Sequence, residues 1–326
     1  MNRSRVITIA RHEYRAAVRS RVLLALVAIL VVVTAASVYI ASVDYSSKLA
    51  DYQAYRAAAQ AGGLKQIAPS PLRLLSLLRG AMEYIDIIGA IIGITLGYLS
   101  VSRERANRTL ALLRSRPVSP GELAAGSALG ALAVISTVIL ATMAVAVVCL
   151  GLVGHDWVSS AEIVKLLLAF AASIIYMGVF YCLGAVMTAR SKVAANGLMF
   201  ALGIWLVVVL ILPQIGDTLD ADNQVPGGLF SALTLNKAQE TKIITKFGTY
   251  ETVRRDIEEA SFAKHYERFA FAMTDVQDKY QGLSLSELLW KKHNDIAWMV
   301  IYPLVLGFAL VRSFRRQPAI TQGVNP

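Results

Sequence analysis

Apolar residues along this 326-residue chain gather into six long runs that carry almost no charge. A helix needs roughly 20 mostly apolar residues to cross about 30 Å of hydrocarbon. The runs are Val22–Ala41, Tyr84–Val101, a span inside Leu123–Gly154, Leu166–Ala189, Val193–Gly216 and Ile296–Val311, of which the last is the shortest. The pattern predicts an all-α, polytopic membrane protein with six transmembrane helices.

Three polar or mixed segments complete the expected organisation. Residues Ile7–Arg21 form an amphipathic pattern and predict a helix that precedes the first span. Segment 42–82 continues helical spacing past the first span, breaks at Gly62-Gly63, and then turns leucine-rich from Leu72, which favours a short piece lying at the membrane surface. We therefore divide the chain into 1–216 with spans one to five, a helical extracytoplasmic module at 217–295, and 296–326 with span six and a tail.

The charge of the chain supports this division. The composition is 56% hydrophobic and 17% charged, with a net charge of +10 and a mean hydropathy of +0.55. The basic residues flank the apolar runs: six arginines precede span one and five lie between spans two and three, whereas Lys165 alone lies between spans three and four. The positive-inside rule then places both termini in the cytoplasm. This distribution indicates contact with membrane lipids and not with nucleic acid.

The sequence lacks the motifs of several classes of enzyme. The sequence has no Gly-Lys pair and hence no phosphate-binding loop, no H-E-x-x-H and no G-x-S-x-G. Its four histidines are scattered, and Cys149 and Cys182 both lie inside apolar runs. We expect no catalytic residues, no metal site, no cofactor in this chain, and no enzymatic activity of its own.

The most informative segment lies between spans two and three, at residues 102–122. Thr109–Leu113 make one short amphipathic turn, Pro117 ends it, and Pro120-Gly121 turns the chain into span three. A short helix with an apolar tip is suited to a partner's groove. The alternative is a basic loop that only rests on anionic lipid headgroups.

This segment resembles the permease subunits of ABC-2 type exporters. Their pattern S-x-E-x-E-x-G-T-L-x-x-L-L-x-x-P-V-S is matched here at Ser102, Glu104, Thr109, Leu110, Leu112, Leu113, Pro117, Val118 and Ser119. The chain departs from the pattern where a second Glu and a Gly are usual, at Ala106 or Asn107 and at Arg108. The stretch from Pro69 to Gly80 also resembles a segment of the subfamily that contains the nitrous oxide reductase maturation permease.

The resemblance implies a permease that forms a homo- or heterodimer and binds two copies of an ABC ATP-binding subunit. ATP and Mg would be held by that partner, and the direction of transport that the resemblance implies is export. The docking residues it implies are Arg103, Glu104, Arg105, Thr109, Leu110, Leu112, Leu113, Pro117, Val118 and Ser119, with His12 and Glu13 on the N-terminal helix.

Two further groups of residues stand out within the spans. Gly89, Gly93 and Gly97 recur every four residues in span two, which predicts close packing against another helix. Glu83 and Asp86 share a helix face at the outer end of that span. They could contact a cationic substrate or pair with Arg73 or Arg79.

Two other functions remain open from the sequence. A membrane scaffold could act on an extracytoplasmic partner protein through module 217–295. A secondary transporter would need no ATPase, but spans one, three, four and five carry no charged residue in their cores.

Overall fold

The computed structural model describes residues 2–62, 73–106, 119–153, 158–219, 229–246, 248–276, 280 and 283–316. Helices make up nearly all of these residues, and no β-strand occurs among them. The N-terminal amphipathic helix is α1 (Arg3–Val18), which Asn2 caps by accepting a hydrogen bond from the Ser4 N–H.

Within the described parts of the chain, six helical spans are long and apolar enough to cross a membrane, which confirms the prediction. Spans one, three and four are the single helices α2 (Arg21–Ala61), α6 (Pro120–Val153) and α7 (Ser160–Arg190). Span two consists of η1 (Leu75–Leu78), α3 (Arg79–Tyr84), η2 (Ile85–Gly89) and α4 (Ala90–Ala106). Span five consists of α8 (Ala194–Trp205), η3 (Leu206–Ile211) and α9 (Leu212–Leu219), and span six is α15 (His293–Arg316).

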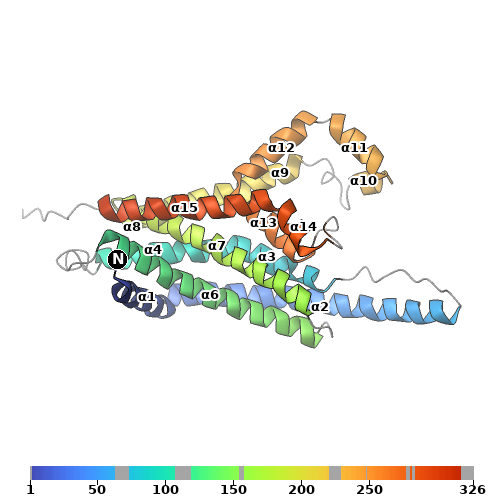
Figure 1. The fold of residues 1–326 in the computed structure, drawn as a ribbon, viewed down its shortest axis with the longest axis horizontal. Helices are drawn as coiled ribbons and strands as arrows, with labels where there is room; N and C mark the ends of the chain where they lie inside the picture. The colour runs from blue at the N-terminus through green and yellow to red at the C-terminus, as the bar shows by residue number, and fades with distance from the viewer. Residues whose placement is uncertain are drawn as a thin grey trace, which may run out of the picture.

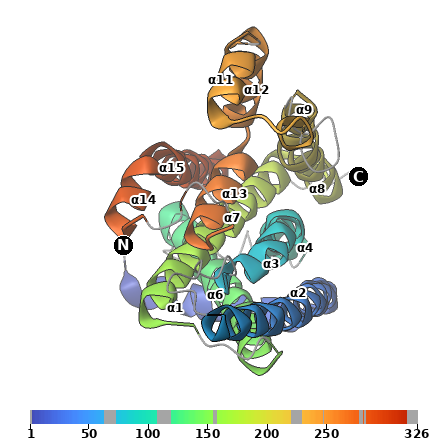
Figure 2. The same cartoon turned by 90° about the vertical axis from the view of Figure 1, so that its right-hand side faces the viewer.

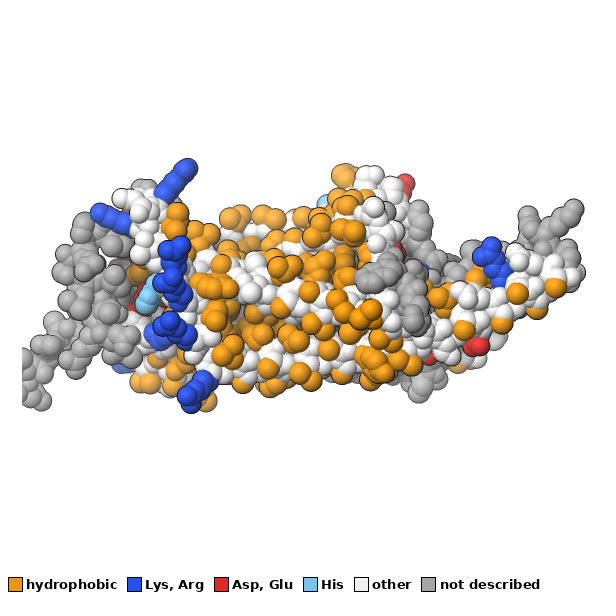
Figure 3. Space-filling model, turned by 90° about the horizontal axis from the view of Figure 1, so that it is seen from below, with side chains coloured by type: hydrophobic (Ala, Val, Ile, Leu, Met, Phe, Trp, Pro, Cys, Tyr) orange, Lys and Arg blue, Asp and Glu red, His pale blue; other side chains and the backbone are white. Residues whose placement is uncertain are grey.

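The spans run alternately up and down, so that three chain segments and α1 meet at one end of an elongated bundle (Figure 1). We call this the basal end and define it by α1 and residues 103–106, 120–123 and 191–193. Arginine and lysine side chains gather at this end, beside a broad apolar belt that covers the middle of the bundle (Figure 3).

The first span is much longer than a membrane requires. Helix α2 has 41 residues, or about 61 Å at 1.5 Å per residue, and it extends past the rest of the bundle at the end opposite α1 (Figure 1). The predicted helical continuation therefore reaches Ala61. The leucine-rich piece differs from its prediction: Leu74, Leu75 and Leu78 are at most 5% exposed, because they pack into the bundle and not on a membrane surface.

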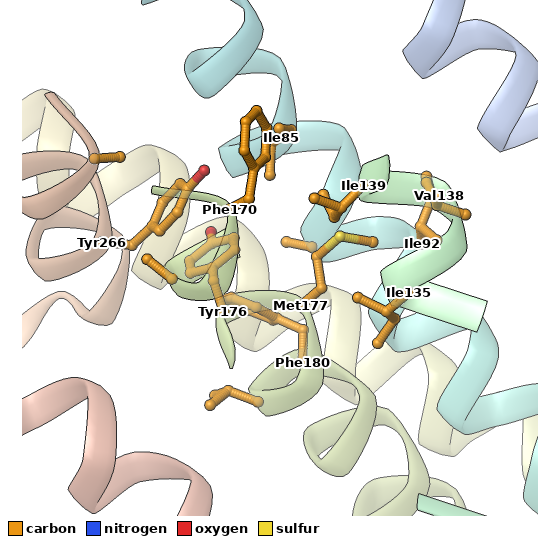
Figure 4. Packing of buried hydrophobic residues seen from close by; sticks show 14 of the residues in the cluster. Ile85, Ile92, Ile135, Val138, Ile139, Phe170, Tyr176, Met177, Phe180 and Tyr266 are labelled. Carbon is orange, nitrogen blue, oxygen red and sulfur yellow. The ribbon is translucent and has the colours of Figure 1, made fainter. Parts of the chain in front are cut away.

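The centre of the bundle is the contact between α4 and α7, where the two backbones touch. A Cβ added to Gly93 would lie 2.5 Å from the Met177 carbonyl oxygen, and one added to Gly97 would overlap the Tyr181 carbonyl. Glycine permits this close approach. Around it, Met177 of α7 lies beside Ile92 of α4 and Ile135 of α6 (Figure 4).

The described helices between residues 229 and 291 lie in two different places. Helices α10 (Leu229–Ala232), α11 (Lys237–Lys246) and α12 (Gly248–Ala260) project away from the bundle (Figure 1), whereas α13 (Phe262–Met273) packs against α7 and α15 (Figure 2). Ten of the 12 residues of α13 are buried. The short α14 (Leu285–Lys291) then leads into span six.

Aromatic rings and ion pairs hold α13 in place. Tyr266 stacks on Tyr176 of α7 at 4.3 Å between ring centroids, and Phe262 lies 4.7 Å from Tyr302 of α15. The His265 ring nitrogens lie 2.9 Å from Asp295 Oδ1 and 3.0 Å from the Glu259 carbonyl oxygen.

The buried amine of Lys264 is also paired, 2.9 Å from Glu267 and 3.3 Å from Asp217. Burial alone would lower the pKa of Lys264, but the two carboxylates outweigh it and raise this pKa. Each charge on α13 that faces the interior thus has an acidic or basic counterpart.

Two spans contain π-helical turns, and both lie near α13. A π-helical turn shifts the helical hydrogen bonding by one residue and leaves a backbone carbonyl without an N–H partner in the helix. Ser261 donates to the Val208 carbonyl of η3 at 2.6 Å, and Tyr176 donates to the Asp86 carbonyl of η2 at 2.8 Å.

We expect Ser261→Ala to lower the free energy of unfolding by about 1–3 kcal/mol, because it leaves the Val208 carbonyl buried without a donor. The variant also removes the Oγ that caps α13 by accepting from the Lys264 N–H. Thermal unfolding in detergent measures the loss, with Ser47→Ala, an exposed position on α2, as the control. Equal midpoints for the two variants would contradict the assignment.

Candidate functional site

The basal end holds both ends of the predicted docking segment. Of the predicted docking residues, Thr109, Leu110, Leu112, Leu113, Pro117 and Val118 lie outside the described residues. The other six are described: His12 and Glu13 on α1, Arg103, Glu104 and Arg105 in the last turn of α4, and Ser119 directly before α6.

Helix α6 begins with a capping box formed by Ser119 and Glu122. Ser119 Oγ accepts from the Glu122 N–H at 3.2 Å, and Glu122 Oε2 accepts from the Ser119 N–H at 3.0 Å. The other carboxylate oxygen, Glu122 Oε1, accepts from the Asn2 N–H at 2.6 Å. The start of α6 is therefore tied to the start of α1. Sequence reasoning missed Glu122, although the pattern Ser-x-x-Glu before an apolar run is the signal for such a cap.

An ion pair joins the last turn of α4 to α1. The Arg103 guanidinium lies 3.0 Å from Glu13 Oε2, and the two side chains are only 29% and 10% exposed. Burial raises the pKa of Glu13, an effect that the charges of Arg103 and His12 partly offset. Helix α1 and its cap thus contact described residues on both sides of segment 107–118: Glu13 pairs with Arg103 before it, and Asn2 pairs with Glu122 after it.

Two glycines of α6 seat α1 against the bundle. A Cβ on Gly126 would lie 2.7 Å from Ile9 Cβ, and one on Gly130 would lie 2.6 Å from Glu13 Cβ. Both glycines therefore face α1. The Glu13 carboxylate reaches Arg103 because Gly130 lets its backbone approach α6.

Arg105 points away from α1 and toward spans four and five. Its guanidinium donates to the Ala189 carbonyl at 2.7 Å and to the Ser191 carbonyl at 2.8 Å, at the C-terminus of α7. The Arg190 Nε donates in turn to Ser313 Oγ of span six at 3.1 Å. Three arginines therefore join the ends of α1, α4, α7 and α15.

The surface of the basal end is cationic. The side chains of Arg3, Arg11, Arg15 and Arg19 on α1 are exposed, and Figure 3 shows basic side chains gathered at this end. Among the residues that the structure describes, no group of three His, Cys, Asp or Glu side chains could hold a metal ion. The arrangement is a cationic surface whose buried contacts join the ends of four helices.

The other predicted contacts lie elsewhere in span two. Gly89, Gly93 and Gly97 all face α7. Glu83 forms an exposed ion pair with Arg79 at 2.8 Å, which is one of the two alternatives that the sequence left open. The Asp86 backbone belongs to η2 and accepts from Tyr176.

Comparison with known proteins gives the chain a family. The model of a family described as "ABC-2 family transporter protein" matches residues 7–318, which include most of α1, all six spans and residues 103–106, 120–123 and 191–193 of the basal end. No curated protein matches the chain. The subfamily suggested by residues Pro69 to Gly80 stays a prediction, and Pro69–Leu72 lie outside the described residues. Six membrane-spanning helices and a match over nearly the whole chain identify this multi-pass membrane protein as a member of the ABC-2 transporter family.

Proposed function

We propose that this chain is the permease subunit of an ABC exporter and that its basal end receives a separate ATP-binding subunit. The observation that carries the proposal is that α1 and its cap are attached to α4 and α6 on either side of segment 107–118, through Glu13–Arg103 and Asn2–Glu122. A force on that segment or on α1 is passed directly to spans two and three. The arginine-rich basal end would face the cytoplasm, where ATP is present.

The proposed assembly contains two permease copies and two ATP-binding subunits. ATP and Mg²⁺ are held by the ATP-binding subunits, and this chain contributes no catalytic group. Closure of the two ATP-binding subunits on ATP would push the basal ends together and open the opposite end of the spans. Family membership supports this arrangement, since such permeases work with ATP-binding subunits and as dimers.

Segment 107–118 is tested by changing its apolar tip. We expect Leu113→Asp to abolish stimulation of the partner ATPase, because a carboxylate cannot enter an apolar groove without a large desolvation cost. Glu104→Gln is expected to reduce the stimulation as well. The measurement is ATPase activity of the purified complex, together with the amount of ATPase that co-purifies with each variant.

The matched control is Leu233→Asp, which places the same charge at an exposed position beside α10, outside the basal end. It should leave co-purification and ATPase stimulation unchanged. Full stimulation in Leu113→Asp would show that segment 107–118 only touches lipid, and the docking proposal would fall.

A second function is favoured by a specific observation. Helices α10–α12 project from the side of the bundle, in the half away from α1, and the far half of α2 extends beyond its end (Figure 1). A membrane scaffold that passes ATP-driven motion to an extracytoplasmic partner protein would use such projections. In that case Leu233→Asp would disturb the external partner while ATPase stimulation stays normal.

A further inference from the structure

The guanidinium of Arg105 connects the end of α4 to the turn between spans four and five. It lies in the last turn of α4, two residues before segment 107–118, and donates to the carbonyls of Ala189 and Ser191. Those carbonyls flank the end of α7, where backbone acceptors have no partner within the helix. Residues 191–193 are all that separate α7 from α8.

Arg103 and Arg105 act on opposite sides of α4. Residues two apart on a helix point about 200° from one another. Arg103 accordingly reaches Glu13 of α1, while Arg105 reaches the turn between α7 and α8. The end of α4 is therefore fixed between α1 on one side and spans four and five on the other.

Helices α4 and α8 both pack against α7 with their backbones in contact at glycines. The Gly93 and Gly97 positions touch the backbone of α7, and Gly197 of α8 touches the backbone of α7 beside Thr188. Close-packed backbones cannot absorb a displacement by side-chain rotation. A movement at the end of α4 will therefore pass to α7 and α8 as a movement of whole helices, provided that their ends stay joined.

We propose that Arg105 is a positioning residue for energy coupling: it carries the displacement produced by the docked ATPase from α4 to the turn between spans four and five. Arg190 extends the connection to span six through Ser313. The inference rests on the proposed function, since it requires an ATPase docked at the basal end. It assigns to Arg105 a role in transmission and not in docking.

The test uses the complete permease–ATPase complex in nanodiscs and compares the nucleotide-free state with the state trapped by ATP and vanadate. Hydrogen–deuterium exchange is followed in peptides from α4 and from α8. In the wild-type complex, trapping should change exchange in both helices. In Arg105→Gln the ATPase should still co-purify and α4 should still respond, but the response of α8 should fall by about five-fold or more.

Two variants serve as controls. Arg312→Gln removes an exposed arginine at the same end of the bundle and should behave as the wild type. Arg105→Lys keeps the charge but cannot reach two carbonyls with a planar fork, and it should lose part of the α8 response. The lysine variant also keeps the test valid if Arg105→Gln fails to fold.

A covalent bridge should replace the arginine. Cysteines at Ser102 and Lys192, joined by a flexible bismaleimide, connect the same two segments in a chain whose Cys149 and Cys182 are alanine. This bridge should restore the α8 response to Arg105→Gln or Arg105→Lys, which a purely structural defect would not allow.

Three results would overturn the inference. The first is a normal α8 response in Arg105→Gln, and the second is loss of ATPase co-purification in that variant, which would make Arg105 a docking residue. The third is failure of the covalent bridge to restore the response. If the wild-type chain neither retains an ATPase nor responds to trapping, the proposed function itself fails, and this outcome is distinct from the others.

Discussion

Gly97→Ala should lower the free energy of unfolding by about 1–3 kcal/mol, even though alanine is the better helix former. The added methyl group would overlap the Tyr181 carbonyl and lie 2.6 Å from the Ala185 nitrogen. Both are backbone atoms and cannot rotate away. Helices α4 and α7 would have to separate along their whole contact, and this contact is the centre of the buried core.

The control for this prediction is the same substitution at Gly203 of α8, where an added Cβ meets nothing within 4 Å. There the change should be neutral or stabilising by about 0.5–1 kcal/mol, because alanine loses less backbone entropy than glycine. Both variants are compared by denaturant titration in detergent, followed by circular dichroism. Equal stability of the two would mean that α4 and α7 do not approach as closely as the structure shows.

Long uncharged runs made the spans predictable. A helix formed by Val22–Ala41 makes all its backbone hydrogen bonds internally, and its apolar side chains are favourable in hydrocarbon. Composition alone therefore predicts that it spans the membrane. The extension of α2 was also predictable, since Tyr45, Leu49 and Tyr52 keep helical spacing beyond the apolar run. These features depend on neighbours in the sequence and need no tertiary information.

The position of α13 was not predictable in this way. Lys264, Glu267 and Arg268 make its sequence look like that of an exposed helix. In the structure Lys264 is buried and pairs with Asp217 of α9, and Arg268 pairs with Glu258 of α12. Local composition does not report such pairing, because a buried charge is tolerated only when the complete fold supplies its counterpart.

The same limit applies to the basal end. The resemblance pointed to Arg103, Arg105 and Glu13 but gave no partners for them. Whether an arginine docks another protein or ties two helices together depends on how α1 is seated. Its close approach to α6 depends on Gly126 and Gly130.

Arg103→Ala should destabilise the chain by about 3 kcal/mol, the low end of the roughly 3–5 kcal/mol expected when one partner of a buried ion pair is removed. The low end applies because the Arg103 side chain is 29% exposed, whereas that of Glu13 is 10% exposed. The variant leaves the Glu13 carboxylate buried opposite no cation of α4. Arg79→Ala breaks the exposed pair with Glu83 and should cost no more than about 1 kcal/mol.

The pH dependence of these variants separates the ion pair from simple loss of packing. The folded-state pKa of Glu13 is raised above its ordinary value near 4.5, so its carboxyl group favours the folded state when protonated. Its contribution is present below that ordinary value and is lost as pH rises through the raised pKa. Removing the Arg103 charge raises the pKa of Glu13 further, so the loss in Arg103→Ala should be larger at pH 8 than at pH 5.

Glu13→Gln should abolish this difference in stability between the two pH values. The double variant Glu13→Gln/Arg103→Ala should be more stable at pH 8 than Arg103→Ala alone, because it contains no unpaired carboxylate at position 13. Denaturant titrations of the four proteins at both pH values form a double-mutant cycle. A coupling energy near zero would show that α1 is held by Gly126, Gly130 and Asn2 without help from the ion pair. In that event a push on α1 would reach α6 but not α4, and the basal end could not act as one unit.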